Sequence, residues 1–340
     1  MISKHKVSIV RCFPDPEKTV SEMYDVVKLA VDLIGGIDKY VQSGDYVMIK
    51  PNMFGNAYRP KISYSYHKGS YSFSTDPRVA IATAMLIRDE GCSHVAIVEC
   101  EDFENKYTGY GYRQMCKEYN IPLLDFNKGP FKKFSVPYDE RSLFPDNYDL
   151  FDFQLNEELD KTDLLISLSK LKIHNGAGIT LCMKNLFGIT PNTIYGKKIG
   201  RHSPRVIFHK GSGTEKCAIP YVINALNMIF RNKMSLSMIE GMVGSNYTEG
   251  YGGEPIEMDV IVAGDNVVAT DAVGALIMKV NPTAEFPNHP FFYSKNHLNF
   301  AHSVGLGSND PNDIELHGEK LNKIVKKFVN DSKRNPYFLL

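Results

Sequence analysis

The sequence predicts an α/β fold in which a largely parallel or mixed sheet is flanked by helices, with a division into two lobes as an alternative. Strand-like and helix-like segments alternate through most of the 340 residues, which is the pattern of sheets whose strands are joined by helices. Short apolar runs bounded by polar residues or glycine are typical of buried strands. We expect strands at residues 6–10, 46–50, 94–99, 164–168, 235–240 and 258–263.

The clearest helix signal begins at Asp76 and Pro77. The Asp76 side chain can cap a helix, and Pro77 suits the first helical position. Apolar residues then recur on one face, and Gly91 is placed to end the helix. Residues 20–34 and 218–230 also have apolar residues at helical spacing, so we expect structural helices there.

The segment 127–156 is the expected boundary if the chain has two lobes. It is rich in Pro, Asp, Tyr and Phe and lacks a sustained hydrophobic period. Without such a boundary, residues 1–340 form a single α/β domain.

The composition is that of a soluble globular protein, with 43% hydrophobic and 23% charged residues. The 39 basic and 39 acidic side chains cancel, so we expect neither a nucleic-acid partner nor a membrane partner. The N-terminal residues lack the apolar core of a signal peptide, and no apolar run is long enough to cross a bilayer. We therefore expect a cytoplasmic location.

The six cysteines are widely spaced, and the closest two are eight residues apart. Zinc ribbons and ferredoxin-type clusters need closely spaced thiolates, so no iron–sulfur cluster is expected from this chain alone. We expect the cysteines to be reduced and partly buried.

The most informative stretch is basic and follows the strand expected at residues 164–168. If the chain stays extended beyond that strand, Lys170, Lys172 and His174 project to one side. Gly176 and Gly178 then allow a tight turn with exposed N–H groups. The stretch therefore predicts one wall of an anion site, with a solvated lysine-rich loop as the alternative.

A helix is expected to follow this turn, over residues 179–186. Its positive end would face the same place as the lysines. Thr180 and Lys184 are four residues apart and would share a face of that helix, and Asn185 lies next to Lys184.

Lys50, Pro51 and Asn52 follow another expected strand, and ligand groups in open α/β sheets lie at strand ends. Lys50 supplies a positive charge and Asn52 both a donor and an acceptor, which suits a carboxylate or phosphate. The alternative is a turn that merely contains Lys and Asn.

Three acidic residues, Glu240, Glu249 and Asp271, could complete such a site or balance its lysines. Glu240 and Glu249 lie before and within the glycine-rich segment 241–253, where they could bind a metal, act as acid or base, or cap backbone amides. Asp265 is the expected N-cap of a helix. Asp271 would lie within that helix on an apolar face, so we expect a partner from the lysine cluster.

These motifs together resemble the domain-of-unknown-function family 362, from near residue 45 to near residue 310. The order and spacing of short motifs carry the resemblance, which covers residues 50–52, 75–77, 169–174, 180–181, 184–188, 249–250, 264–265 and 271–273. The family is widespread in prokaryotes and its activity is largely unassigned. Some members carry ferredoxin-like segments, whose cysteines this chain lacks. Members often have Asp where this chain has Glu240, which keeps the charge but changes its reach.

The leading hypothesis is a cytoplasmic enzyme that binds a small anionic substrate, a carboxylate or a phosphate. His174 is the expected general acid–base, because its ordinary pKa is near neutrality, and a desolvated lysine such as Lys172 is the alternative base. Glu240, Glu249 and Asp271 would bind a divalent cation or balance the lysines. The expected substrate-binding residues are Lys50, Asn52, Lys170, Thr180, Lys184 and Asn185, together with Lys172.

Two other classes of function stay open. The first is a redox accessory or electron-transfer protein that works with a separate iron–sulfur partner protein. The second is a non-catalytic binding module that uses the same pocket. The sequence leaves a homo-oligomer open as well.

Overall fold

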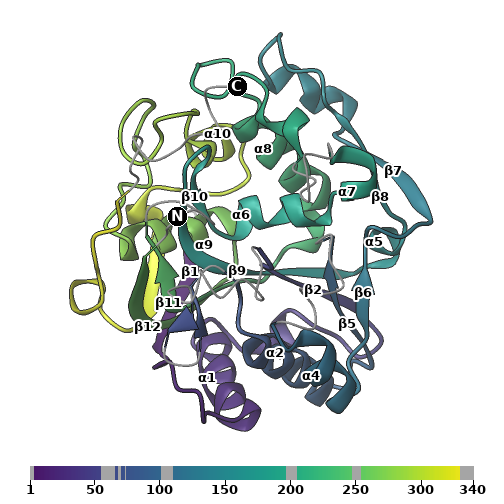
Figure 1. Cartoon of the computed structure of the whole chain (residues 1–340), viewed down its shortest axis with the longest axis vertical. Helices are drawn as coiled ribbons and strands as arrows, with labels where there is room; N and C mark the ends of the chain where they lie inside the picture. Colours follow the sequence, from purple (N-terminus) through teal and green to yellow (C-terminus); the bar gives the residue numbers. More distant parts are fainter. Residues whose placement is uncertain are drawn as a thin grey trace.

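The structure is a computed structural model that describes residues 4–54, 66–67, 70–72, 74–100, 110–196, 205–246 and 254–329. Its centre is a nine-stranded mixed sheet in the order β13-β1-β12-β11-β9-β2-β5-β6, with β10 paired to β9 (Figure 1). The expected α/β fold is therefore confirmed. The strands are β1 (His5–Arg11), β2 (Tyr46–Pro51), β5 (His94–Glu99), β6 (Leu123–Asp125), β9 (Leu164–His174), β10 (Gly178–Thr180), β11 (Ser237–Ser245), β12 (Pro255–Gly264) and β13 (Ile314–Gly318).

The strand directions decide where the polar residues meet. β6, β5, β2, β9 and β11 run parallel to one another, whereas β12 is antiparallel to both β11 and β1. The carboxyl ends of β2, β5, β9 and β11 therefore lie at one edge of the sheet. In open α/β sheets this edge is where ligands bind.

Helices cover both faces of the sheet (Figure 1). α1, α2 and α4 pack on one face and α6, α8, α9 and α10 on the other, each face with its own apolar core. Among the described residues, no helix is both long and apolar enough to cross a bilayer. The helices are α1 (Val20–Asp32), α2 (Pro77–Asp89), α4 (Tyr112–Glu118), α5 (Glu158–Lys161), α6 (Cys182–Asn185), α7 (Asn192–Tyr195), α8 (Ile219–Phe230), α9 (Val267–Ile277) and α10 (His297–Ser303).

The expected strands and helices are confirmed, most within two residues of their ends. α2 begins at Pro77 with Asp76 as its N-cap, because the Asp76 side chain accepts the N–H of Arg78. Two strands continue further than expected, since β9 reaches His174 and β11 reaches Ser245. The predicted lysine cluster depends on this extension, because Lys170, Lys172 and His174 project to one side only if β9 continues past residue 168.

The segment 127–156 contains a small hairpin of β7 (Phe131–Ser135) and β8 (Asp152–Asn156). Phe153 and Leu155 of β8 are fully buried and belong to the same core as α8 and α9. A second short pair, β3 (Tyr66–His67) with β4 (Ser70–Tyr71), lies outside the main sheet. Whether the chain is one domain or two lobes stays a prediction.

The helix expected over residues 179–186 is wrong at its start. Residues 178–180 form β10, which pairs antiparallel with β9, so that Thr180 lies opposite Lys172. Gly178 has φ of +82°, which lets the chain turn back on itself, and the pairing satisfies backbone groups of β9. The helix α6 begins only at Cys182, so Thr180 and Lys184 do not share a helical face.

The expected N-cap of α9 is also wrong by one residue. Asn266 is the cap, and its Oδ1 accepts the N–H groups of Val268 and Ala269 at 3.0 Å. Asp265 instead accepts the N–H of Lys6 at 3.0 Å, because β1 lies beside the end of β12. Both residue types favour caps, so only the position of the neighbouring strand separates them.

The turn at Gly178 leads to the first prediction. Gly178→Ala would place a Cβ 2.4 Å from the Phe291 ring at a positive φ, whereas Gly305 has φ of +77° with nothing within 4 Å. We expect Gly178→Ala to cost about 2–4 kcal/mol in the free energy of unfolding and Gly305→Ala only about 1–2 kcal/mol, measured by urea unfolding. If the two variants lost the same free energy of unfolding, the Phe291 ring would be able to move aside for the added Cβ at no cost.

Candidate functional site

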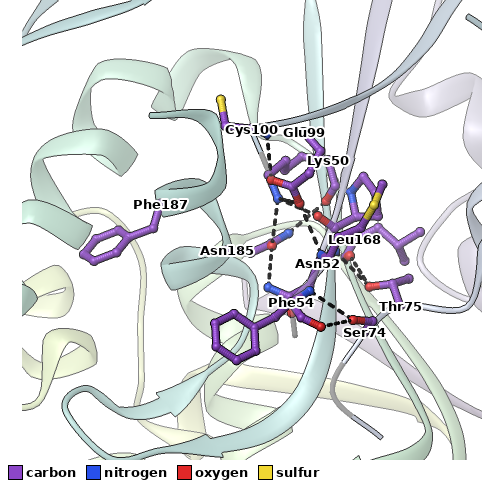
Figure 2. Close-up of polar contacts among 12 residues, drawn as sticks. Lys50, Asn52, Phe54, Ser74, Thr75, Glu99, Cys100, Leu168, Asn185 and Phe187 are labelled. Atoms are coloured by element: carbon purple, nitrogen blue, oxygen red, sulfur yellow. Dashed lines mark hydrogen bonds and ion pairs between the residues drawn. The ribbon is translucent and has the colours of Figure 1, made fainter. Parts of the chain in front are cut away.

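Lys50 forms a buried ion pair at the end of β2 (Figure 2). Its Nζ lies 2.6 Å from Glu99 Oε2, and both side chains are almost completely buried. Glu99 also accepts the N–H of Met53 at 3.2 Å and that of Cys100 at 2.9 Å. Lys50 is therefore brought into the predicted site, and its charge is balanced by a carboxylate at the end of the neighbouring strand β5.

Asn52 and Asn185 join Lys50 to Lys172. Asn185 Oδ1 accepts from Lys50 Nζ at 3.3 Å and from Asn52 Nδ2 at 3.0 Å. Asn52 Oδ1 in turn accepts from Lys172 Nζ at 2.7 Å. Thr75 Oγ1 holds the Asn52 backbone by accepting its N–H and donates to the Leu168 carbonyl. The predicted residues Lys50, Asn52, Lys172 and Asn185 thus form one continuous hydrogen-bonded chain.

Lys170 belongs to a different network. Its Nζ lies 2.5 Å from Glu240 Oε2, and neither side chain is exposed. Glu240 also accepts the N–H of Asp76 at 3.2 Å and that of Met242 at 2.8 Å. Burial lowers the pKa of Lys170 and raises the pKa of Glu240, while the charge of each partner opposes these shifts. This pair lies against the start of α2.

Lys172 lies between two buried hydroxyl groups. Its Cα partners are Thr180 on β10 and Ser245 on β11. Residues opposite each other on neighbouring strands place their side chains on the same face, so the three form a row. Thr180 Oγ1 and Ser245 Oγ are buried and have no hydrogen-bond partner within the described part of the chain. We call Thr180, Lys172 and Ser245 the hydroxyl row.

Aromatic rings lie against two of the lysines. Lys172 Nζ is 5.2 Å from the centre of the Phe54 ring, and Lys184 Nζ is 5.3 Å from the centre of the Phe187 ring. In Figure 2 the Phe187 ring lies to the left of Asn185 and the Phe54 ring lies below the two asparagines. Lys184 is 8% exposed and Phe187 is 7% exposed, so this contact is shielded from water.

His174 lies at the end of β9 and faces a second histidine. Its Nδ1 accepts the N–H of Ala177 at 3.0 Å, so a neutral ring carries its proton on Nε2. The His174 and His209 rings are stacked, with centres 6.5 Å apart and planes at 27°. A third histidine, His297, is fully buried, and burial followed by the charges of Lys184 and His174 lowers its pKa to about 3.

Asp271 does not pair with a lysine, contrary to expectation. Its two oxygens accept the N–H of Cys182 at 2.7 Å and that of Met183 at 2.9 Å. These are the first N–H groups of α6, which need an acceptor because a helix leaves its first donors unpaired. An internal carboxylate therefore occupies the helix start that was expected to face the anion.

Of the predicted metal ligands, the structure describes Glu240 and Asp271, and it does not bring these two together. Glu240 contacts α2 on one face of the sheet and Asp271 lies in α9 on the other, and N–H groups or a lysine occupy the oxygens of both. In the described ranges, no group of three or more His, Cys, Asp or Glu could hold a metal ion. Glu249 lies outside the described residues, so its metal role stays a prediction.

Two surface clefts lie apart from these networks. One, of about 410 Å³, lies between the segment around Phe144 and the helices α8 and α10. The other, of about 480 Å³, lies beside α4 and the edge strand β6. Neither cleft includes a predicted site residue.

A family model identifies the chain. The model for a domain of unknown function, DUF362, matches residues 47–276. The protein belongs to the DUF362 family. The match includes both asparagines, the hydroxyl row and both buried ion pairs of this DUF362 protein. The family description names no activity.

One curated relative of this DUF362 protein is a thylakoid-associated protein, sll1697, from Synechocystis sp.. It is 24% identical over 279 residues, which are 77% of this chain and 74% of the relative. The name of that relative places it at thylakoids and says nothing of a substrate.

Several residues of the site were not predicted from sequence. Glu99 is the last residue of an expected strand, and this position at a strand end could have indicated a site residue. Ser245 stands in the glycine-rich segment and gains its place only by pairing with β9. Phe54, Phe187 and His209 look like ordinary core or surface residues until the fold brings them beside the lysines.

The ion pair of Lys50 and Glu99 gives a stability prediction. We expect Lys50→Met alone to cost about 3–5 kcal/mol in the free energy of unfolding, because it leaves a buried carboxylate without its partner. The double variant Lys50→Met, Glu99→Leu should cost clearly less than the sum of the two single changes. Urea unfolding of the four proteins measures the coupling, and additive losses would contradict it.

Asp271 gives a prediction about pH. Burial raises its pKa from 3.8 to about 7, although the two N–H groups act in the opposite direction. The folded state therefore binds a proton that the unfolded chain releases, and stability falls as pH rises between these two values. For each pH unit by which the pH rises in this window, we expect the free energy of unfolding of Asp271→Asn to increase by about 1.4 kcal/mol relative to that of the wild type. A constant difference from acidic to neutral pH would contradict the assignment.

Proposed function

We propose that this DUF362 protein is an enzyme that binds a small anion, a carboxylate or a phosphate, at the carboxyl ends of β9 and β11. Lys172 is the cationic anchor, and the hydroxyls of Thr180 and Ser245 donate hydrogen bonds to the anion. The asparagine pair orients the Lys172 ammonium through Asn52 Oδ1. Lys50 and Lys170 support this arrangement from within their ion pairs.

The unpaired hydroxyls of the hydroxyl row carry the proposal. Thr180 and Ser245 are each 1% exposed and lack a hydrogen-bond partner in the described residues. Burying an unpaired hydroxyl costs about 1–3 kcal/mol of folding stability. Two such hydroxyls on either side of a lysine therefore indicate a role in binding. An anion between them would accept both hydroxyl hydrogens and pair with the ammonium, which removes the cost.

His174 is the proposed acid–base group. It stands two residues beyond Lys172 on the same strand, so both side chains leave the same face. The bond from Ala177 N–H to Nδ1 keeps Nε2 as the nitrogen that exchanges a proton. A group bound to the anion can then give a proton to this nitrogen or take one from it.

The hydroxyl row is tested by anion binding. We expect Thr180→Val and Ser245→Ala each to weaken the binding of phosphate or of a small carboxylate about tenfold or more, because each removes a hydrogen bond to a charged group. Neither variant should lose stability, since neither hydroxyl has a partner in the protein. Titration calorimetry and urea unfolding measure the two effects.

Ser237→Ala is the matched control. Ser237 is a buried serine of the same strand β11 whose hydroxyl also has no partner in the described residues, but it lies at the opposite end, facing Ser167. It should leave anion binding unchanged. Failure of the wild-type protein to bind phosphate, sulfate or any small carboxylate would refute the proposal.

Enzymatic activity needs a separate test. Native mass spectrometry of the purified protein should reveal a co-purifying anion, whose turnover is then followed. We expect His174→Gln to lose turnover while binding is kept, whereas Lys172→Met should lose both. A ligand that binds but is never converted would favour the non-catalytic binding module, and a visible absorption band in anaerobically purified protein would favour the redox alternative.

We also propose a cytoplasmic location. All six cysteines are free and buried, as suits a reducing compartment. Because the Synechocystis relative is named for thylakoid association, cell fractionation must include the membrane fraction. Recovery of the native protein mainly with membranes would contradict this location.

A further inference from the structure

Two lysines of the site lie against aromatic rings. The Nζ atoms of Lys172 and Lys184 are 5.2 Å and 5.3 Å from the centres of the Phe54 and Phe187 rings. The lysines at the outer end of the site are thus set among aromatic rings.

The rings continue beyond the two lysines. The Phe187 ring meets the His209 ring edge to face, with centres 6.5 Å apart and planes at 87°. His209 in turn stacks with His174, the proposed acid–base group. Phe54 lies against Lys172, and His174 stands two residues beyond Lys172 on β9, so both rings lie beside the lysine that is proposed to anchor the anion. The side chains of Phe54, His174 and His209 are only partly buried.

Rings of this kind do little for a small inorganic anion. Phosphate or acetate needs hydrogen-bond donors and cations, which the hydroxyl row already supplies. An aromatic face offers such an ion no donor and displaces its water. A planar conjugated group attached to the anion, in contrast, gains stacking or edge-to-face contact with each ring that it meets.

We propose that the anion recognised by this protein carries a planar conjugated ring, as in an aromatic carboxylate or an aryl phosphate. The inference rests on the proposed function, because the hydroxyl row holds the charged end. The rings of Phe54, Phe187 and His209 receive the planar end. The competing explanation is that the rings only shield the lysines from water.

Matched pairs of anions test the inference on the full chain. Titration calorimetry compares benzoate with cyclohexanecarboxylate, and phenyl phosphate with cyclohexyl phosphate. The members of each pair match in charge and closely in size, and differ in planarity. We expect the planar member to bind about threefold to tenfold more tightly, from one or two aromatic contacts.

Leucine variants locate the preference. Phe54→Leu and Phe187→Leu keep an apolar side chain but remove the ring. We expect the ratio of the affinity for the planar anion to the affinity for the saturated anion to fall towards one, while the affinity for the saturated anion changes less than twofold. Phe300→Leu is the control, because Phe300 is a partly buried phenylalanine of α10 that lines a separate cleft. If Phe187→Leu fails to fold, Phe54→Leu and the wild-type comparison decide.

The outcomes separate the two proposals. Equal affinity for both members of each pair in the wild type would overturn the planar-ring inference and leave anion binding intact. A preference that survives in both leucine variants would also overturn it. If the wild type binds phosphate but none of the four ring-bearing anions, only the planar-ring inference fails. If it binds neither phosphate nor any carboxylate, the proposed function fails and the planar-ring inference fails with it.

Discussion

Burial of lysine at the carboxyl ends of the central strands is the constraint on which the rest of the structure depends. Removing an ammonium from water is costly unless a carboxylate is held at close range. Glu99 serves Lys50 from the next strand β5, and Glu240 serves Lys170 from the neighbouring strand β11. The strand order and the charge balance are therefore coupled, because another order would leave buried charges uncompensated.

The same constraint explains why the outer lysine is suited to binding. With Lys50 and Lys170 neutralised by protein carboxylates, their charges contribute less to the field at the sheet edge. Lys172 is fixed by an amide oxygen of Asn52, which orients the ammonium without cancelling its charge. An ammonium group beside two buried hydroxyls that lack a partner among the described residues is the arrangement that we propose an anion completes.

The sequence predicted those parts of the fold that local patterns determine. β5 spans the expected residues 94–99, and α2 starts at Pro77 as its cap predicts, because short apolar runs and helix caps depend on near neighbours. Features that depend on distant pairing were missed or wrong. β10 exists because residues 178–180 pair with β9, and Asn266 caps α9 because Asp265 accepts the Lys6 N–H.

The candidate site shows the same division. Lys50, Asn52, Lys172 and Asn185 were predicted and lie in one hydrogen-bonded chain. The first three stand near the ends of β2 and β9, and Asn185 is the last residue of α6. Their carboxylate, hydroxyl and aromatic partners come from other strands and loops. Asp271 matters most here, because it already occupies the start of α6. Because the N–H groups of Cys182 and Met183 already donate to Asp271, they cannot bind an anion from outside. In the proposed function the anion is therefore recognised by the side chains of Lys172, Thr180 and Ser245.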